Sequence, residues 1–506
     1  MDLAVFVLAP VVQGFKNLIE EDGAVYTAFD EMFRQAAAAE AAVAAEAAAE
    51  VAATAAVAVE AARAADVAGA EAAALAAKTA ALAVRSAAAA GTAQAARQAE
   101  ETANAQVQAA TAGVVAAQAL GAAAAAAAVE AAAATAAVAA AAKAAAAVTK
   151  AEAQVEDYVE LMLVINTLLL TPPRYGLGPS VMASSVPFYA VISRFCNTHA
   201  GYEAFTNPRV NANLCGVFTQ WQDFLVAQES RVVLGDGPGG WFSDIALRAM
   251  VESAGGNPDL QTFQDFYVCV PNADHYGFAS YDAFFTRQLR PNQAIPPDNN
   301  PFIIRSACSS TVHRLYTNLR KTERFCIKNT PYSLRHILAG DEDVDTFVGG
   351  TLLQAMLGCT DYHRWHSPVN GIVVRTRLIS GTMNPSPVPH PTYFAGLLDG
   401  ERKDLDVITR SQDFVTAIST RALIFIQADD PVGLMCFVAV GLCEVSTCEI
   451  TVNENQVIQK GDPLGTFRFG GSTHCLIFRR GLNVTPIDQN LVGSKVQVGQ
   501  DIFNVA

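Results

Sequence analysis

Near its C-terminal end the chain reads GDPLGTFRFGGSTHCLIF, residues Gly461–Phe478. β-rich runs flank Gly-Gly-Ser-Thr, so the stretch predicts a tight turn between two strands. The simplest interpretation is an ordinary glycine hairpin, because such turns are common between strands. A second interpretation gives the turn a chemical role, which depends on the serine that directly follows a glycine.

The chemical interpretation is self-cleavage between Gly471 and Ser472, with Gly470 and Thr473 as supporting residues. Glycine leaves its carbonyl unshielded and tolerates unusual backbone angles. The Ser472 hydroxyl would attack the Gly471 carbonyl and move the acyl group from nitrogen to oxygen. Elimination and hydrolysis would then leave a pyruvoyl group where Ser472 stood. Serine is a weak nucleophile at its own pKa, so the reaction needs a nearby base.

A base is available in DYHRWHSPVNG, Asp361–Gly371, where His363 and His366 stand three residues apart. Alone, such a pair is more typical of structure than of catalysis. A metal site is not predicted, because no carboxylate or cysteine stands at a spacing that completes it, and Asp361 is too close in sequence to serve with both histidines. Combined with the Gly-Ser bond, the pair favours the chemical interpretation.

Composition divides the rest of the 506-residue chain. Residues 35–154 are dominated by alanine, which favours helix but specifies no coiled-coil seam, and we interpret them as a low-complexity insert. From Val155 to about Leu260, apolar residues at three- and four-residue spacing predict helices. Beyond Pro301 short β-rich runs predict an antiparallel β-rich domain with one helix at Ser333–Ala339. The runs are FIIRS, GIVVRTRLI, ALIFIQA, LMCFVAVGL, CEITV and HCLIF.

Charge and cysteine usage limit the partners and the compartment. A net charge of -15 argues against nucleic acid as a partner, since a basic face would be expected. The ten cysteines form no CxxC pair, which favours free thiols in a reducing compartment. No signal peptide is predicted, and the apolar run Leu161–Leu170 is too short to span a bilayer. We therefore expect a soluble, cytoplasmic protein.

Several motifs together resemble a known family. GGST and YHRWHSPVNG are similar to the two signatures of phosphatidylserine decarboxylases, and further matching motifs follow the family's order. They are YDAFFTRQLRP (Tyr281–Pro291), FCIKNTPYSL (Phe325–Leu334), FVGG (Phe347–Gly350) and VAVGLCEVS (Val438–Ser446). The region before Tyr281 resembles the N-terminal domain of the soluble members, among them the fungal L-tryptophan decarboxylases.

The resemblance implies an α+β fold, with a helical N-terminal domain followed by an antiparallel β-rich catalytic domain. Residues 1–34 would begin the N-terminal domain, residues 35–154 would be the alanine-rich insert, and residues 155–280 would complete the helical domain. Residues 281–506 would form the catalytic domain, which is cut at 471/472.

Roles for the site residues also follow from the resemblance. Ser472 would become the pyruvoyl group, so neither pyridoxal phosphate nor a metal is expected. His366 would be the base for self-cleavage, and His363 would assist decarboxylation or reprotonation, with Tyr362 a weaker candidate for the proton donor. The products would be a large subunit ending at Gly471 and a small one, residues 472–506.

One position departs from the family's pattern. The acidic residue of the self-cleavage triad aligns with Ser309 in SACSST, Ser306–Thr311. A serine cannot orient a histidine by charge, so either His366 works without a carboxylate or another acid takes that place. Loss of an orienting carboxylate can cost about 10⁴ in rate in a serine triad. A single-turnover maturation tolerates such slowness better than repeated catalysis does.

We expect a pyruvoyl-dependent carboxy-lyase that decarboxylates an L-amino acid, with an aromatic one favoured, through a Schiff base. The alternative is a phosphatidylserine decarboxylase that makes phosphatidylethanolamine, which would need a membrane-docking face and a phosphate site. A third hypothesis is a non-catalytic relative with a binding role; Ser309 favours it, while GGST and both histidines weigh against it. The expected partners are the substrate and the two cleavage fragments as subunits, and homo-oligomerisation stays open.

Overall fold

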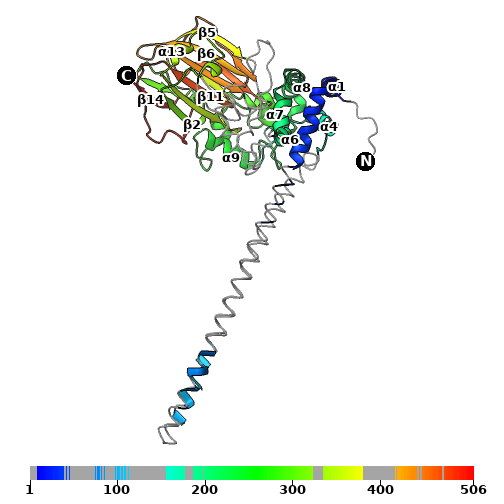
Figure 1. The fold of residues 1–506 in the computed structure, drawn as a ribbon. Coiled ribbons are helices and arrows are strands. Elements are labelled where there is room, and N and C mark those ends of the chain that lie inside the picture. The colour runs from blue at the N-terminus through cyan, green and yellow to red at the C-terminus, as the bar shows by residue number, and fades with distance from the viewer. Residues whose placement is uncertain are drawn as a thin grey trace. The chain divides into compact units, whose positions relative to one another are not determined.

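The computed structural model describes residues 8–38, 155–176, 186–196, 198–293, 295–322, 334–379, 419–441, 447–469 and 472–506, together with Thr416, Glu444 and scattered positions between 41 and 112. The chain divides into two compact units, residues 1–37 with 155–506 and residues 38–154 (Figure 1). In the second unit every described residue is helical and exposed, as expected from the helix preference of alanine. The domain boundaries expected from the sequence stay a prediction.

The first unit begins with a helical part whose elements come from both sides of the alanine-rich segment. Its elements are α1 (Pro10–Glu21), α4 (Tyr158–Leu168), α6 (Pro187–Cys196), α7 (His199–Thr206), α8 (Pro208–Val226), η2 (Gln228–Val233), α9 (Asp244–Ser253), α10 (Phe263–Phe266), η3 (Asp274–Gly277), α11 (Tyr281–Phe285) and η4 (Pro291–Gln293). Residues 23–38 are helical as well. The helices expected from periodicity are therefore present.

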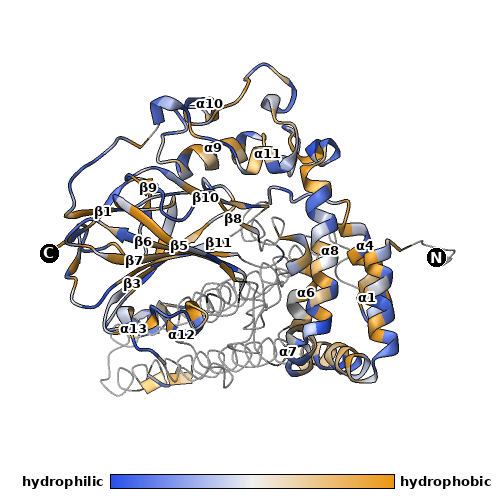
Figure 2. Ribbon diagram, turned by 90° about the horizontal axis from the view of Figure 1, so that it is seen from above, coloured by the Kyte–Doolittle hydropathy of each residue, from blue (hydrophilic) through white to orange (hydrophobic). Residues whose placement is uncertain are grey.

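Local sequence explains where the main helices begin. Asp157 caps α4 by accepting from the backbone N–H groups of Val159 and Glu160. Asn207 caps α8 in the same way, and Pro208 occupies the first helical turn, where no N–H is needed. α1 packs against α4 and α8, which brings the two ends of the alanine-rich segment into one core (Figure 2).

The β-rich part contains three antiparallel sheets. The strands are β1 (Ile303–Arg305), β2 (Ser310–Thr317), β3 (Thr351–Leu357), β4 (Arg364–His366), β5 (Gly371–Ile379), β6 (Arg421–Ala428), β7 (Leu434–Gly441), β8 (Thr447–Ile450), β9 (Val457–Ile458), β10 (Pro463–Arg468), β11 (Ser472–Phe478), β12 (Val484–Pro486), β13 (Lys495–Val496) and β14 (Asp501–Val505). Two short helices, α12 (Leu334–Ile337) and α13 (Val344–Phe347), lie among them. The α+β prediction is confirmed.

The largest sheet has the strand order β13-β2-β3-β11-β7-β6-β5-β9, and the smaller ones are β4-β10-β8 and β1-β14-β12. All seven residues of β11 are buried, because the strand is central and both of its faces are covered. The prediction that Gly-Gly-Ser-Thr forms a tight turn between two paired strands is therefore wrong in two respects. Ser472 and Thr473 already belong to β11, and β10 and β11 lie in different sheets rather than forming a hairpin.

No helix in the part of the chain that the structure describes is both long enough and apolar enough to cross a membrane.

Candidate active site

Ser472 is the first residue of the central strand β11 and lies where the two strands beside it end. It pairs with Leu357, the last residue of β3, and with Gly441, the last residue of β7. β2 begins at the same edge, because Thr311 pairs with Met356. The ends of these strands therefore meet at Ser472, and we call this region the Ser472 edge.

Polar side chains of the helical part hold the Ser472 edge. Arg468, at the end of β10, donates through Nε to Asp282 of α11 at 2.9 Å and forms an ion pair with that carboxylate. Gln222 of α8 donates to Thr447 of β8 at 2.7 Å. Charge-assisted pairs of this kind fix geometry as well as adding energy. The strand that leads to Ser472 is thus anchored just before the expected cleavage site.

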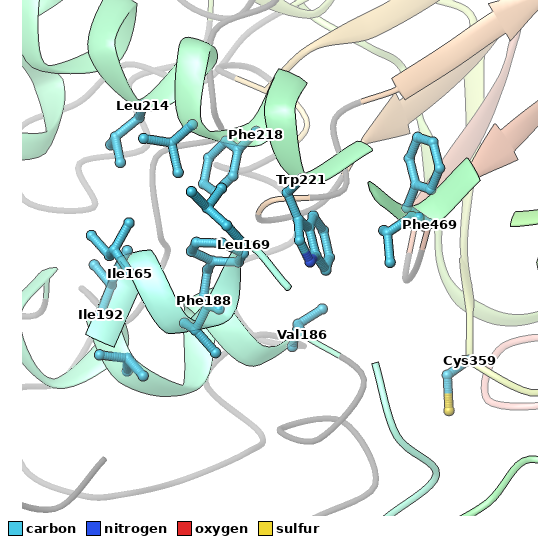
Figure 3. Close-up of a cluster of buried hydrophobic side chains, with 14 of the residues drawn as sticks. Ile165, Leu169, Val186, Phe188, Ile192, Leu214, Phe218, Trp221, Cys359 and Phe469 are labelled. Atoms are coloured by element: carbon cyan, nitrogen blue, oxygen red, sulfur yellow. The ribbon is translucent and has the colours of Figure 1, made fainter. Parts of the chain in front are cut away.

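Two segments that adjoin the same edge contribute apolar side chains to the helical core. Cys359 and Phe469 come from the β-rich part, yet they are buried in the helical core with Trp221 of α8 and Val186 (Figure 3). Tyr362 belongs to the same core. These side chains exclude water, which strengthens electrostatic interactions at the edge.

Ser472 itself is 1% exposed, and none of the described residues gives its Oγ a hydrogen-bond partner. The neighbouring Thr473 hydroxyl instead donates to the Ala355 carbonyl at 2.8 Å. Three residues before Ser472, Phe469 is buried with φ 78°, a left-handed conformation that costs a bulky residue on the order of 1–3 kcal/mol. A hydroxyl to which the described residues give no partner thus follows closely on a strained residue. Gly470 and Gly471 lie outside the described residues.

His363 is a neutral base with one free nitrogen. Its Nδ1 donates to the Asp361 carbonyl at 2.9 Å, and because a carbonyl only accepts, the proton sits on Nδ1. Nε2 then carries the lone pair, and it has no partner among the described residues. Burial, with Arg287 nearby, lowers the pKa of His363 to about 3. The ring therefore stays neutral at physiological pH, and it lies 4.2 Å from the ring of Phe285, centroid to centroid.

His366 has both ring nitrogens engaged. Nδ1 donates to the Gly461 carbonyl at 2.7 Å, so Nε2 accepts from the Tyr362 hydroxyl at 3.0 Å. Burial lowers the pKa of His366 and raises that of Tyr362. The two histidines expected at the site therefore differ, since only His363 has a free lone pair.

Ser309 lies near His366 in the fold, since the His366 amide donates to the carbonyl of Ala307 at 2.9 Å. The Ser309 hydroxyl nevertheless donates to Gln497 at 3.2 Å and accepts from the amide of Val498 at 3.1 Å. These contacts tie Ser309 to the C-terminal segment, and both ring nitrogens of His366 bind other groups.

Asp361 is the buried carboxylate of this region. Its side chain forms an ion pair with Lys495, accepts from the Ser253 hydroxyl and accepts from the Gly358 amide at 2.7 Å. It reaches His363 through its main-chain carbonyl instead of its carboxylate. Asp361 thus holds the loop that orients His363. The sequence did not indicate this role, because Asp361 stands only two residues before His363.

Two further residues of the edge carry no role in the sequence analysis. Glu444 lies three residues beyond β7 in VAVGLCEVS and accepts from the Phe188 amide at the start of α6, at 3.0 Å. Arg287 lies in YDAFFTRQLRP and donates to the carbonyls of Thr360 and Asp361 at 2.7 and 2.8 Å. Glu444 is the one charged residue of its motif, which is a signal in the sequence, whereas Arg287 shares its motif with Asp282 and Arg290 and has no such signal. In the described residues, no group of three or more His, Cys, Asp or Glu is arranged to hold a metal ion.

Comparison with known proteins identifies the family of the chain. One family model, described as phosphatidylserine decarboxylase, matches residues 281–504, and a second of the same description matches residues 121–250. The decarboxylase iboD of Amanita muscaria is 34% identical over 358 residues, which cover 68% of this chain and 99% of that protein. The chain belongs to the phosphatidylserine decarboxylase family. It is accordingly a decarboxylase of this family, and the recognition made from the motifs is confirmed.

Other relatives define the branch. The L-tryptophan decarboxylase of Psilocybe cubensis is 35% identical over 342 residues, 64% of this chain and 73% of that protein. Phosphatidylserine decarboxylase proenzyme 3 of Schizosaccharomyces pombe is 32% identical over 228 residues, 44% of this chain and 21% of that protein. The decarboxylase thus resembles the tryptophan-decarboxylase branch over more of its length. The second family match begins inside the alanine-rich segment, at residue 121.

Glu444 generates a prediction about stability. Burial raises the pKa of this carboxyl to about 8 from its ordinary 4.5, so folding favours the protonated form. The contribution of the Glu444 carboxyl to the free energy of unfolding is complete below pH 4.5 and is lost as the pH rises to 8. Relative to Glu444→Gln, which keeps an oxygen for the Phe188 amide, the wild type should lose up to a few kcal/mol of unfolding free energy between pH 5 and 8.5.

Urea unfolding at several pH values measures this difference. Glu229→Gln, at an exposed position, is the control and should follow the pH dependence of the wild type. Parallel curves for the wild type and Glu444→Gln would show that the Glu444 carboxyl is ionised in the folded chain.

Proposed function

We propose that the decarboxylase cuts itself between Gly471 and Ser472, carries a pyruvoyl group at the position of Ser472, and decarboxylates an aromatic L-amino acid in the cytoplasm. Its two fragments would stay together as the subunits. The observation that carries this proposal is the Ser472 hydroxyl, buried and without a partner among the described residues, close to the strained Phe469. A hydroxyl so placed is available for attack instead of being held by the fold.

Self-cleavage would proceed through an ester between Ser472 and Gly471. Ser472 Oγ bonds to the carbonyl carbon of Gly471, the C–N bond breaks, and the hydroxyl proton ends on the Ser472 nitrogen. Removal of the Cα proton then expels the Gly471 carboxylate from Cβ and leaves a double bond. One water molecule replaces the nitrogen, which departs as ammonia, and a ketone remains. A pyruvoyl ketone accepts a substrate amine and takes up the electron pair released with CO₂.

The two histidines would divide the proton transfers. Following the family resemblance, His366 serves the cut, and the hydroxyl of Tyr362 must first leave its Nε2. His363 serves turnover, because its neutral ring and free Nε2 suit a group that holds and returns a proton. Arg287 and Asp361 keep the His363 ring in place through the loop that precedes it.

Two observations support an aromatic amino acid as the substrate. Phe469, three residues before Ser472, and Tyr362, next to His363, are buried aromatic side chains of the helical core, which would accept an apolar ring. The resemblance to L-tryptophan decarboxylases covers more of the chain than the resemblance to the phosphatidylserine decarboxylase of Schizosaccharomyces pombe. Phosphatidylserine is the second candidate, because the family model carries that name.

The cut is tested by intact mass. Ser472→Ala removes the attacking oxygen, so the variant should remain one polypeptide with no activity. Thr473→Val is the matched control, since the neighbouring hydroxyl serves only the Ala355 carbonyl, and this variant should still be cut. Cleavage of Ser472→Ala, or an uncut wild type without a ketone that hydrazine can trap, would refute the proposal.

The histidine roles are tested by measuring scission and turnover separately. His366→Ala should remain uncut, whereas His363→Ala should be cut and then lose about 10²–10⁴ in turnover, the usual range for a general acid or base. The reverse pattern would assign the cut to His363, whose Nε2 has no partner among the described residues.

The substrate is tested by CO₂ release from L-tryptophan, L-phenylalanine and phosphatidylserine in mixed micelles. We expect turnover of at least one aromatic amino acid to exceed that of the phospholipid, because the chain resembles the L-tryptophan decarboxylases over more of its length. Faster turnover of phosphatidylserine would support the second candidate. A chain that is not cut and releases no CO₂ would support a non-catalytic relative.

A further inference from the structure

Arg287 is a buried cation that no carboxylate of the described residues pairs with. The residue is 2% exposed, and no carboxylate of the described residues lies within 4.0 Å of its guanidinium. Nη2 donates to the carbonyls of Thr360 and Asp361, while Nε and Nη1 have no acceptor in the described part of the chain. The guanidinium also lies over the ring of Tyr267, 4.5 Å from its centroid.

Burying a charged group without a partner is costly, and each unmade hydrogen bond adds to that cost. The contacts with the rings of Tyr267 and Phe284, the second at 5.3 Å from its centroid, offset only part of this cost, since a desolvated cation–π contact is worth about 2 kcal/mol and leaves the N–H donors without acceptors. Arg421 shows how this fold satisfies a structural arginine. It is equally buried, yet Nε, Nη1 and Nη2 each donate to a backbone carbonyl. Each guanidinium nitrogen of Arg421 thus has an acceptor, whereas two of the three nitrogens of Arg287 have none among the described residues.

The position of Arg287 connects these donors to the Ser472 edge. The Asp361 carbonyl that accepts from Arg287 also accepts from Nδ1 of His363. The loop that contains both carbonyls starts directly after Leu357, the strand partner of Ser472. The chain of contacts from Arg287 to Ser472 thus runs through one short loop.

We propose that Arg287 binds the α-carboxylate of the substrate, with a free guanidinium N–H donating to a carboxylate oxygen. The inference rests on the proposed function and adds the residue that recognises the substrate's charged group. An ion pair there would orient the bond from Cα to the carboxylate relative to the pyruvoyl position, which is a large part of catalysis by positioning. The same carboxylate occurs in a free amino acid and in the serine of phosphatidylserine, so the inference holds for either.

The test compares how the enzyme binds the aromatic amino acid and how it binds the arylalkylamine that decarboxylation produces. In the cut Arg287→Gln enzyme, KM for the aromatic amino acid should rise about 10- to 100-fold, the range expected for one charge-assisted hydrogen bond. The inhibition constant of the corresponding arylalkylamine, which has no carboxylate, should change less than about threefold. Intact mass should show normal scission. For a lipid-specific enzyme, phosphatidylserine and phosphatidylethanolamine form the equivalent pair.

Arg364→Gln is the matched control, since this neighbour of His363 donates to the Thr286 carbonyl, and its acid-to-amine ratio should equal that of the wild type. Equal weakening of acid and amine in Arg287→Gln, or no weakening of either, would overturn the inference. If that variant does not fold, Arg287→Lys keeps the charge, and a selective loss of acid affinity in it decides the question in the same way.

Failure of the role of Arg287 and failure of the proposed function give different results. A wild-type chain that is uncut or releases no CO₂ contradicts the proposed function alone. Calorimetric binding of the acid and the amine to that chain and to Arg287→Gln then gives the same comparison, and an unchanged ratio would overturn the role of Arg287.

Discussion

The position of Ser472 and of the loops around it depends on the pairing of β11 between β3 and β7. Seven residues from Ser472 to Phe478 are hydrogen-bonded on both sides and buried on both faces. Side chains alternate along a strand, so a shift of one residue would exchange those on the two faces. The register therefore determines that Ser472 is the first paired residue and that it meets the ends of both neighbouring strands. The proposed catalytic groups on the adjoining loops would depend on this rigid frame.

The helical part contributes polar contacts to that frame as well as apolar packing. Asp282 holds Arg468, the Phe188 amide holds Glu444, and Ser253 donates to Asp361. Several buried polar atoms at the same edge have no partner among the described residues, including Ser472 Oγ and His363 Nε2. Buried polar groups are normally satisfied, so their concentration beside a strained residue is typical of a site that sacrifices stability for chemistry.

Much of this arrangement could be predicted from the sequence, because local patterns specify it. Continuous apolar runs indicated β7 and β11, three- and four-residue spacing indicated α4 and α8, and the paired motifs indicated Ser472, His363 and His366. The central position of β3 was not indicated, although TLLQAML is also apolar, because strand order depends on partners more than a hundred residues away. For the same reason the sequence did not reveal that the Asp361 carboxylate binds Lys495. The positive φ of Phe469 has no local signal either, since aromatic residues rarely adopt it.

The C-terminal strands are interleaved with those that precede Ser472. β11 lies between β3 and β7, β13 pairs with β2, and β14 pairs with β1. A nick in front of β11 would break one covalent bond and none of these hydrogen-bond ladders. The short piece could then leave only by dismantling the sheet from its centre, so the nicked protein should be as hard to dissociate as the intact chain is to unfold.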